Sequence, residues 1–131
     1  KGASLELELE PCPQLLGHRS MVRDALNNLL SNSLKYRRED VPGRCILSVR
    51  HEGSWVILTV TDNGLGVPED QRERIFDPFV RIEDAKRERP GGHGLGLSIV
   101  ADTVRQHSGS ARCMDGMDGG ARFELRLRIE A

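Results

Sequence analysis

The sequence is poor in several features that mark common classes of protein. It has one Trp, one Tyr and three Phe among 131 residues, so it offers no aromatic platform for stacking single-stranded nucleic acid. Its three cysteines, Cys12, Cys45 and Cys113, are far apart and form no Cys-x-x-Cys pair, which argues against a disulfide scaffold or a zinc site. No apolar run approaches the roughly 20 residues that span a bilayer. A net charge of −1 favours neither nucleic acid nor an anionic membrane as a partner.

Alternation of apolar and polar residues is the clearest local pattern, and it predicts five strands. These strands cover residues 5–9, 45–50, 55–61, 110–114 and 122–129. We expect the first to be half-buried, because Leu5, Leu7 and Leu9 alternate with glutamates. The second and third strands follow one another closely and predict a hairpin.

Apolar residues spaced by three and four predict helices between the strands. One covers residues 20–36 with Ser20 as its N-cap, and another covers residues 94–106. Pro68, followed by two acidic residues, predicts a short third helix that ends near Ile75. Hairpins alternating with helices favour an α+β fold, a two-layer α/β sandwich, over a doubly wound parallel sheet.

Three polar residues of the first helix, Asn28, Asn32 and Lys35, are spaced by four and three and share one face. Amide oxygens suit Mg²⁺ when phosphate oxygens and water complete its shell, and the lysine adds a positive charge for phosphate. A solvated polar face is the alternative interpretation. Asparagine is a poor helix former, so the crowding of asparagines on this helix favours a functional reason.

A turn of sequence DNGLG at residues 62–66 follows the apolar strand. The carboxylate of Asp62 can accept a hydrogen bond from the exocyclic amine of adenine, where guanine would place a carbonyl oxygen. Gly64 and Gly66 would let the backbone pass close to a base. A plain Asn-Gly turn is the alternative.

A glycine-rich stretch at residues 91–96 leads into the helix at 94–106. Such a stretch lets backbone N–H groups approach a phosphate at a helix N-terminus. The charged residues 81–90 before it lack a core pattern and predict a mobile loop. Phe76 and Phe79, on either side of Pro78, are candidate anchors for that loop. The candidate phosphate contacts are Arg81, Lys86, Arg87, Arg89 and His93. Solvated charges and an incidental loop histidine are the alternative interpretation.

Five motifs, in order, resemble those of the catalytic and ATP-binding domain of bacterial sensor histidine kinases, within the Bergerat-fold ATPase superfamily. They are similar to the N box (residues 28–36, NLLSNSLKY), the first glycine box (62–66, DNGLG), the F box (76–79, FDPF), the second glycine box (92–97, GHGLGL) and the closing glycine turn (119–123, GGARF). No P-loop, dinucleotide fingerprint or eukaryotic kinase motif is present. Two positions depart from the family pattern: Ser33 stands where Ala is usual, and Ala121 where Thr or Ser is frequent.

The resemblance implies a mixed, mostly antiparallel sheet covered on one face by three helices, with residues 1–131 forming one domain and residues 80–93 a flexible ATP lid. It implies ATP and Mg²⁺ as cofactors, with Asn28 and Asn32 on the metal and Lys35 beside them in catalysis. The implied ATP-binding residues are Asn28, Asn32, Lys35, Tyr36, Asp62, Gly64, Gly66, Val67, Ile75, Phe79, Arg81, Gly92, His93, Gly94, Leu95, Gly96 and Leu97.

The activity implied is that of a protein-histidine kinase in a two-component system. The γ-phosphoryl of ATP passes to a histidine on a separate dimerisation domain, and then to an aspartate of a response regulator. His18, His51 and His107 lack a phosphoacceptor context, so we expect this chain to lack its own phosphoacceptor. The resemblance also implies that it is a cytoplasmic domain of a longer, inner-membrane-anchored kinase. A serine kinase or ATPase of the same fold, or a docking module that does not bind ATP, are the alternatives.

Overall fold

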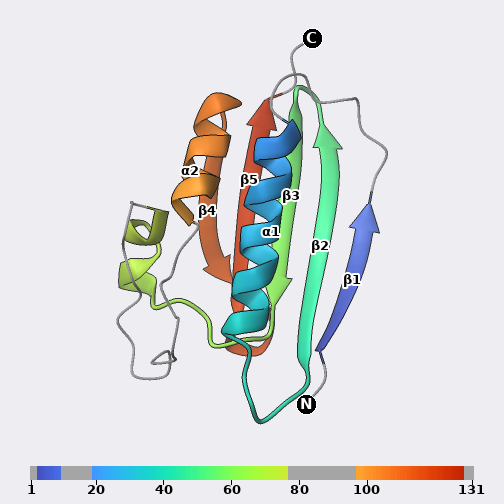
Figure 1. Ribbon diagram of the computed structural model, residues 1–131, viewed down its shortest axis with the longest axis vertical. Helices are drawn as coiled ribbons and strands as arrows, with labels where there is room; N and C mark the ends of the chain where they lie inside the picture. The colour runs from blue at the N-terminus through green and yellow to red at the C-terminus, as the bar shows by residue number, and fades with distance from the viewer. Residues whose placement is uncertain (1–2, 10–18, 77–96, 129–131) are drawn as a thin grey trace.

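A five-stranded sheet with two α-helices on one face forms the domain (Figure 1). The computed structural model describes residues 3–9, 19–76 and 97–128 of the chain. In chain order its elements are β1 (Ala3–Leu9), α1 (Arg19–Lys35), β2 (Gly43–Glu52), β3 (Trp55–Asp62), η1 (Glu69–Gln71), η2 (Arg74–Phe76), α2 (Leu97–Gln106), β4 (Ser110–Asp115), η4 (Met117–Gly119) and β5 (Ala121–Arg128). No helix in this part of the chain is long and apolar enough to cross a membrane.

The strands lie in the order β1-β2-β3-β5-β4, and only the β1–β2 pair is parallel. β2 and β3 form the predicted hairpin across the two residues Gly53 and Ser54. The register sets Cys45 on β2 opposite Asp62 on β3. The sheet is therefore mixed and mostly antiparallel, as expected.

The core lies between the sheet and the two helices. Val56, Leu58 and Val60 alternate along β3 and turn one buried face toward the helices, as the period of two requires. From α1, Ala25 and Leu29 pack into the same cluster with no exposed surface. The remaining buried members come from the β3–η2 segment, α2 and β5: Val67, Ile75, Leu97, Val100, Val104, Ala121, Phe123, Leu125 and Leu127.

The predicted third helix is wrong for the described residues, where two 3₁₀ turns, η1 and η2, take its place beside two α-helices. The segment after Pro68 is short and buries only Ile75 through these turns. A single buried residue gives too little packing to offset the cost of nucleating a helix. The N-cap prediction is also wrong, because α1 begins at Arg19 and includes Ser20. α2 begins at Leu97, and residues 94–96 lie outside the described residues.

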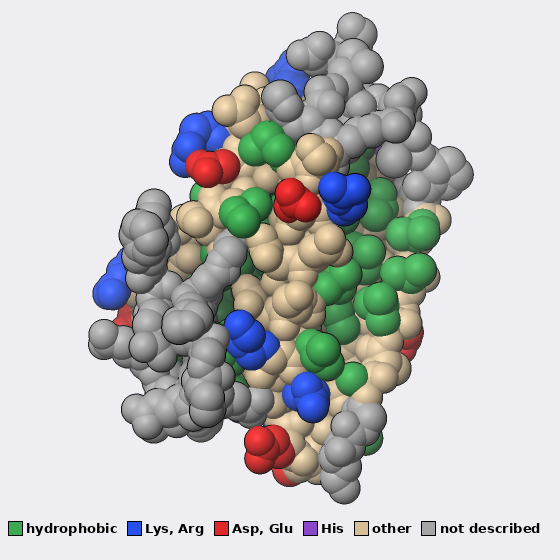
Figure 2. All heavy atoms as spheres, viewed as in Figure 1, with side chains coloured by type: hydrophobic (Ala, Val, Ile, Leu, Met, Phe, Trp, Pro, Cys, Tyr) green, Lys and Arg blue, Asp and Glu red, His purple; other side chains and the backbone are tan. Residues whose placement is uncertain are grey.

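The first strand is more exposed than its alternation predicts. Leu5, Leu7 and Leu9 are each at least half exposed. Among the described strands, β1 lies at the edge of the sheet and pairs with β2 alone. Figure 2 shows hydrophobic side chains gathered on the side of the molecule where β1 and α1 lie. The exposed Leu34 of α1 adds to the apolar side chains left open to solvent.

Candidate functional site

Asp62, the last residue of β3, lies at the centre of a buried hydrogen-bond network. Its Oδ1 accepts hydrogen bonds from the backbone N–H groups of Gly64, at 2.9 Å, and of Ala121, at 3.0 Å. Its Oδ2 accepts one from the Ser33 hydroxyl of α1, at 2.9 Å. Residues from α1, the glycine turn and β5 therefore fix the orientation of one carboxylate that is only 6% exposed.

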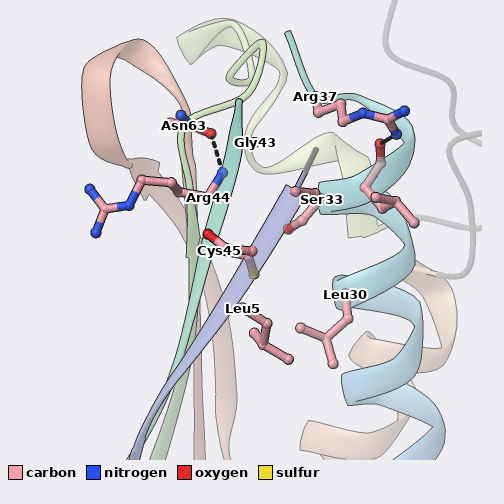
Figure 3. Close-up of a pocket in the computed structure, with 11 residues that line it drawn as sticks. Leu5, Leu30, Ser33, Arg37, Gly43, Arg44, Cys45 and Asn63 are labelled. Atoms are coloured by element: carbon pink, nitrogen blue, oxygen red, sulfur yellow. Dashed lines mark hydrogen bonds between the residues drawn. The ribbon is translucent and has the colours of Figure 1, made fainter. Parts of the chain in front are cut away.

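The turn after Asp62 is bound to the neighbouring elements through Asn63 and Leu65. The Asn63 Oδ1 accepts a hydrogen bond from the Arg44 N–H at 2.8 Å, and its Nδ2 donates to the Pro42 carbonyl at 3.0 Å (Figure 3 shows the first bond). The Leu65 N–H donates to the Tyr36 carbonyl just beyond α1, at 3.1 Å. The turn therefore joins the C-terminal end of α1 to the start of β2.

Both glycines of the turn lie against backbone. A Cβ at Gly64 would lie 2.7 Å from the Tyr36 carbonyl oxygen, which is closer than any side chain tolerates. Gly66 has a φ of +73° and faces the Gly119 carbonyl of the closing turn. The backbone therefore requires glycine at both positions, independently of any ligand.

The N-box residues lie on α1 as the sequence predicts. Asn28 and Asn32 are half-buried and one helical turn apart, while Lys35 is exposed in the last turn. Two neutral amide oxygens at this spacing fit Mg²⁺, which normally takes one or two protein ligands and keeps water and phosphate for the rest. The described residues contain no group of three or more His, Cys, Asp or Glu that could hold a metal ion. The assignment of Asn28 and Asn32 to Mg²⁺ stays a prediction.

The apolar residues assigned to the site belong to the core around it. Val67, Ile75 and Leu97 are all at most 5% exposed and pack in one cluster. Phe76 meets Phe123 of β5 edge to face, with ring centroids 6.4 Å apart. Tyr36, just after α1, is half-buried. These contacts bring the segment after the glycine turn against the sheet and α2.

The remaining predicted residues lie outside the described residues. They are Phe79, Arg81, Gly92, His93, Gly94, Leu95 and Gly96, together with the expected lid at 80–93. Their roles stay predictions.

Comparison with known proteins decides the family. A family model described as "Histidine kinase-, DNA gyrase B-, and HSP90-like ATPase" matches residues 17–131. The chain belongs to this family. The relatives of this ATPase domain include the alginate biosynthesis sensor protein KinB of Pseudomonas aeruginosa, 36% identical over 127 residues, and the sensor histidine kinase CpxA of Escherichia coli, 35% identical over 129 residues. The alignments cover 96% and 98% of this chain but only 20% and 27% of those proteins.

Solved structures agree with the sequence relatives. The mycobacterial sensor histidine kinase MprB superimposes with a TM-score of 0.84 at 27% identity, covering 98% of this chain and 84% of that one. Full-length ShkA, solved in complex with AMPPNP, gives a TM-score of 0.77 at 28% identity, covering 99% of this chain and 27% of that one. The chain therefore has the fold and the sequence of the ATPase domain of sensor histidine kinases.

One contact of the ATPase domain is absent from the sequence prediction. Ser33 is identified there only as a departure from the family pattern, whereas its hydroxyl donates directly to Asp62. The contact joins residues 29 positions apart, so no local pattern reveals it. The sequence signal that could have indicated this contact is a hydroxyl one residue after Asn32, on the side of α1 that faces the sheet.

Proposed function

We propose that this chain is the ATP-binding catalytic domain of a two-component sensor histidine kinase, which binds Mg-ATP and transfers its γ-phosphoryl to a histidine. Membership of the ATPase family supports ATP as the nucleotide. The observation that carries the proposal is the Asp62 carboxylate, buried at the end of β3 and held by three donors. AMPPNP bound to ShkA, which has the same fold, agrees with it.

In this proposal Asp62 selects adenine. One Oδ2 acceptor position points at the exocyclic amine of the base, and a guanine carbonyl there would leave that position of the buried carboxylate without a donor. Gly64 and Gly66 keep side chains away from the base, while Val67 and Ile75 supply the apolar surface beside it. Leu97 belongs to the second glycine box, which is assigned to the phosphates. Tyr36 flanks the nucleotide.

Phosphate binding is assigned to α1 and to the glycine-rich segment. Asn28 and Asn32 would hold Mg²⁺, which supplies charge neutralisation on the transferred phosphoryl group when it is bound. Lys35 adds a positive charge on the same face of α1. Arg81, His93 and the glycines at residues 92–96 would contact the phosphates from the lid, with Phe79 at its base. Transfer then depends on positioning and electrostatic stabilisation.

The partners proposed are a dimerisation domain that carries the phosphoacceptor histidine and a response regulator whose aspartate receives the phosphoryl group. The chain spans about a fifth to a quarter of the length of the relatives KinB and CpxA. Transfer therefore requires parts of a longer protein. We place this domain on the cytoplasmic side of a membrane-anchored kinase, where ATP is available.

Calorimetric titration with ATP, with and without Mg²⁺, tests the proposal. Asp62→Asn replaces the acceptor facing adenine with an N–H donor and is expected to weaken ATP binding by about tenfold or more. Asn32→Ala should weaken binding only when Mg²⁺ is present. Asn27→Ala, at an exposed position of the same helix, is the matched control. It should leave ATP binding unchanged both with and without Mg²⁺. If wild-type protein does not bind ATP, or if Asp62→Asn binds it equally well, the proposal is wrong.

A further inference from the structure

Ser33 is an interior residue of α1 whose hydroxyl bonds outside its own helix. Serine in a helix commonly donates to the carbonyl four residues earlier. Here the Ser33 Oγ donates to Asp62 Oδ2 at 2.9 Å, and the residue is 8% exposed. The bond links α1 to the end of β3, so it fixes a side chain of the nucleotide site from the helix that carries the asparagines.

The carboxylate of Asp62 has about four acceptor positions, and their occupancy is uneven. Oδ1 accepts two backbone N–H groups, from Gly64 and Ala121. Oδ2 accepts a hydrogen bond from the Ser33 hydroxyl, and no other described residue occupies its second position. Both departures from the family pattern therefore meet on this carboxylate: Ser33 contacts it through its hydroxyl, and Ala121 through its backbone N–H.

We propose that Ser33 is a positioning residue that orients Asp62 Oδ2 toward the exocyclic amine of adenine and so increases the preference for ATP. This inference rests on the proposed function. Of the three donors to the carboxylate among the described residues, Ser33 is the only side chain. It is therefore the one donor that a substitution can remove without altering the backbone.

The surroundings of Ser33 favour this orientation of its hydroxyl. Figure 3 shows Ser33 pointing from α1 toward the sheet, with Leu30 on the same helix and Cys45 on β2 nearby. Cys45 is the register partner of Asp62. Burial raises the pKa of the Cys45 thiol, against the effect of its hydrogen bond with Ser33, and the Asp62 charge raises it further. The thiol stays neutral near pH 7 and is a weak acceptor, so the carboxylate is the stronger partner for the hydroxyl.

The effect of the hydroxyl should depend on the amine of the base. Without the Ser33 hydroxyl, Oδ2 loses the one donor that it has in the described part of the chain, and its orientation must be fixed when the nucleotide binds. ATP needs that order because its amine bonds to Oδ2. Purine riboside triphosphate, which lacks the amine, does not need it. A merely structural role for Ser33 would affect both nucleotides equally.

The test compares Kd values for the Mg²⁺ complexes of ATP and purine riboside triphosphate. Ser33→Ala should weaken ATP binding about fivefold and leave the binding of purine riboside triphosphate within about twofold. Ser33→Thr keeps the hydroxyl and should retain the wild-type ratio of the two Kd values. Ser31→Ala is the matched control, because Ser31 is an exposed serine of the same helix, and it should change neither Kd.

Two results would overturn the inference. Equal weakening for both nucleotides in Ser33→Ala would assign Ser33 a structural role only. Unchanged or tighter ATP binding would mean that the hydroxyl does not position the carboxylate, or competes with adenine for it. Failure of the proposed function is separate, since wild-type protein would then not bind ATP, or Asp62→Asn would not weaken ATP binding.

Discussion

At the scale of single residues, the site depends on close backbone packing around one carboxylate. Asp62 bonds to two segments that are distant in sequence, through Ser33 and Ala121, and Asn63 bonds to a third, the segment of Pro42 and Arg44. The glycines of the turn make those contacts possible, because Gly64 lies against Tyr36 and Gly66 against Gly119. The rigidity of the Asp62 carboxylate, the proposed acceptor for adenine, therefore comes from packing that is present without a nucleotide.

Gly66→Ala should destabilise the protein more than Gly53→Ala does. Both glycines have a positive φ, +73° and +58°, so alanine at either position carries a strain of about 1 kcal/mol. At Gly66 the added Cβ would also clash with a backbone atom, the carbonyl oxygen of Gly119. A Cβ added at Gly53 would have no neighbouring atom within 4 Å. Urea unfolding should show a loss of about 3 kcal/mol or more for Gly66→Ala. Equal losses in the two variants would contradict this packing.

The sequence identifies the chemistry of these residues better than their partners. Asp62 is predictable as a site residue because a carboxylate is unexpected at the end of an apolar strand and before two glycines. Its presence there indicates a functional role. Its bonds to Ser33 and Ala121 span 29 and 59 positions, and no periodicity encodes such distances. The same holds for Asn63, whose side chain bonds to Pro42 and Arg44 although a plain turn would account for it.

At the scale of elements, α1 packs against the core with one face and carries the candidate metal ligands on another. One face packs Ala25 and Leu29 into the core, and another presents Asn28 and Asn32. Helical periodicity predicts this division, since residues three and four apart share a face. Burial of the core face therefore fixes where the asparagines lie.

Leu29→Ala should cost far more stability than Leu34→Ala. Leu29 has no exposed surface, whereas Leu34, on the same helix, is 54% exposed. The same change of side chain should lower the free energy of unfolding by about 2–5 kcal/mol at the buried position. At the exposed position we expect a loss of about 0.5 kcal/mol or less. Comparable urea midpoints for the two variants would contradict the assignment of the core face.

Most strands and both α-helices are predictable because one side of each is buried. The hairpin of β2 and β3 and the pair β4 and β5 match the predicted ranges closely. The sequence predictions fail for elements that lack such a buried side. β1 alternates like a half-buried strand but lies at the sheet edge with its leucines exposed, and the segment after Pro68 has too few buried residues to form an α-helix.

At the scale of the whole molecule, the site assembles at one end of the sheet. The end of α1, the start of β2, the end of β3 and the start of β5 meet there through hydrogen bonds from Ser33, Arg44, Leu65 and Ala121. Four elements that are separate in sequence thus share one network. Nucleotide bound at Asp62 should alter the environment of all four.

Residue-resolved NMR titration with Mg-ATP tests the central claim most directly, because it locates the bound nucleotide on the domain. The amide resonances of Gly64 and Ala121, which donate to Asp62, should shift and saturate with one Kd, together with the side-chain amides of Asn28 and Asn32. The indole resonance of Trp55, at the other end of β3, should not move. The account would be contradicted if the Gly64 and Ala121 amides kept their positions while other regions of the protein titrated.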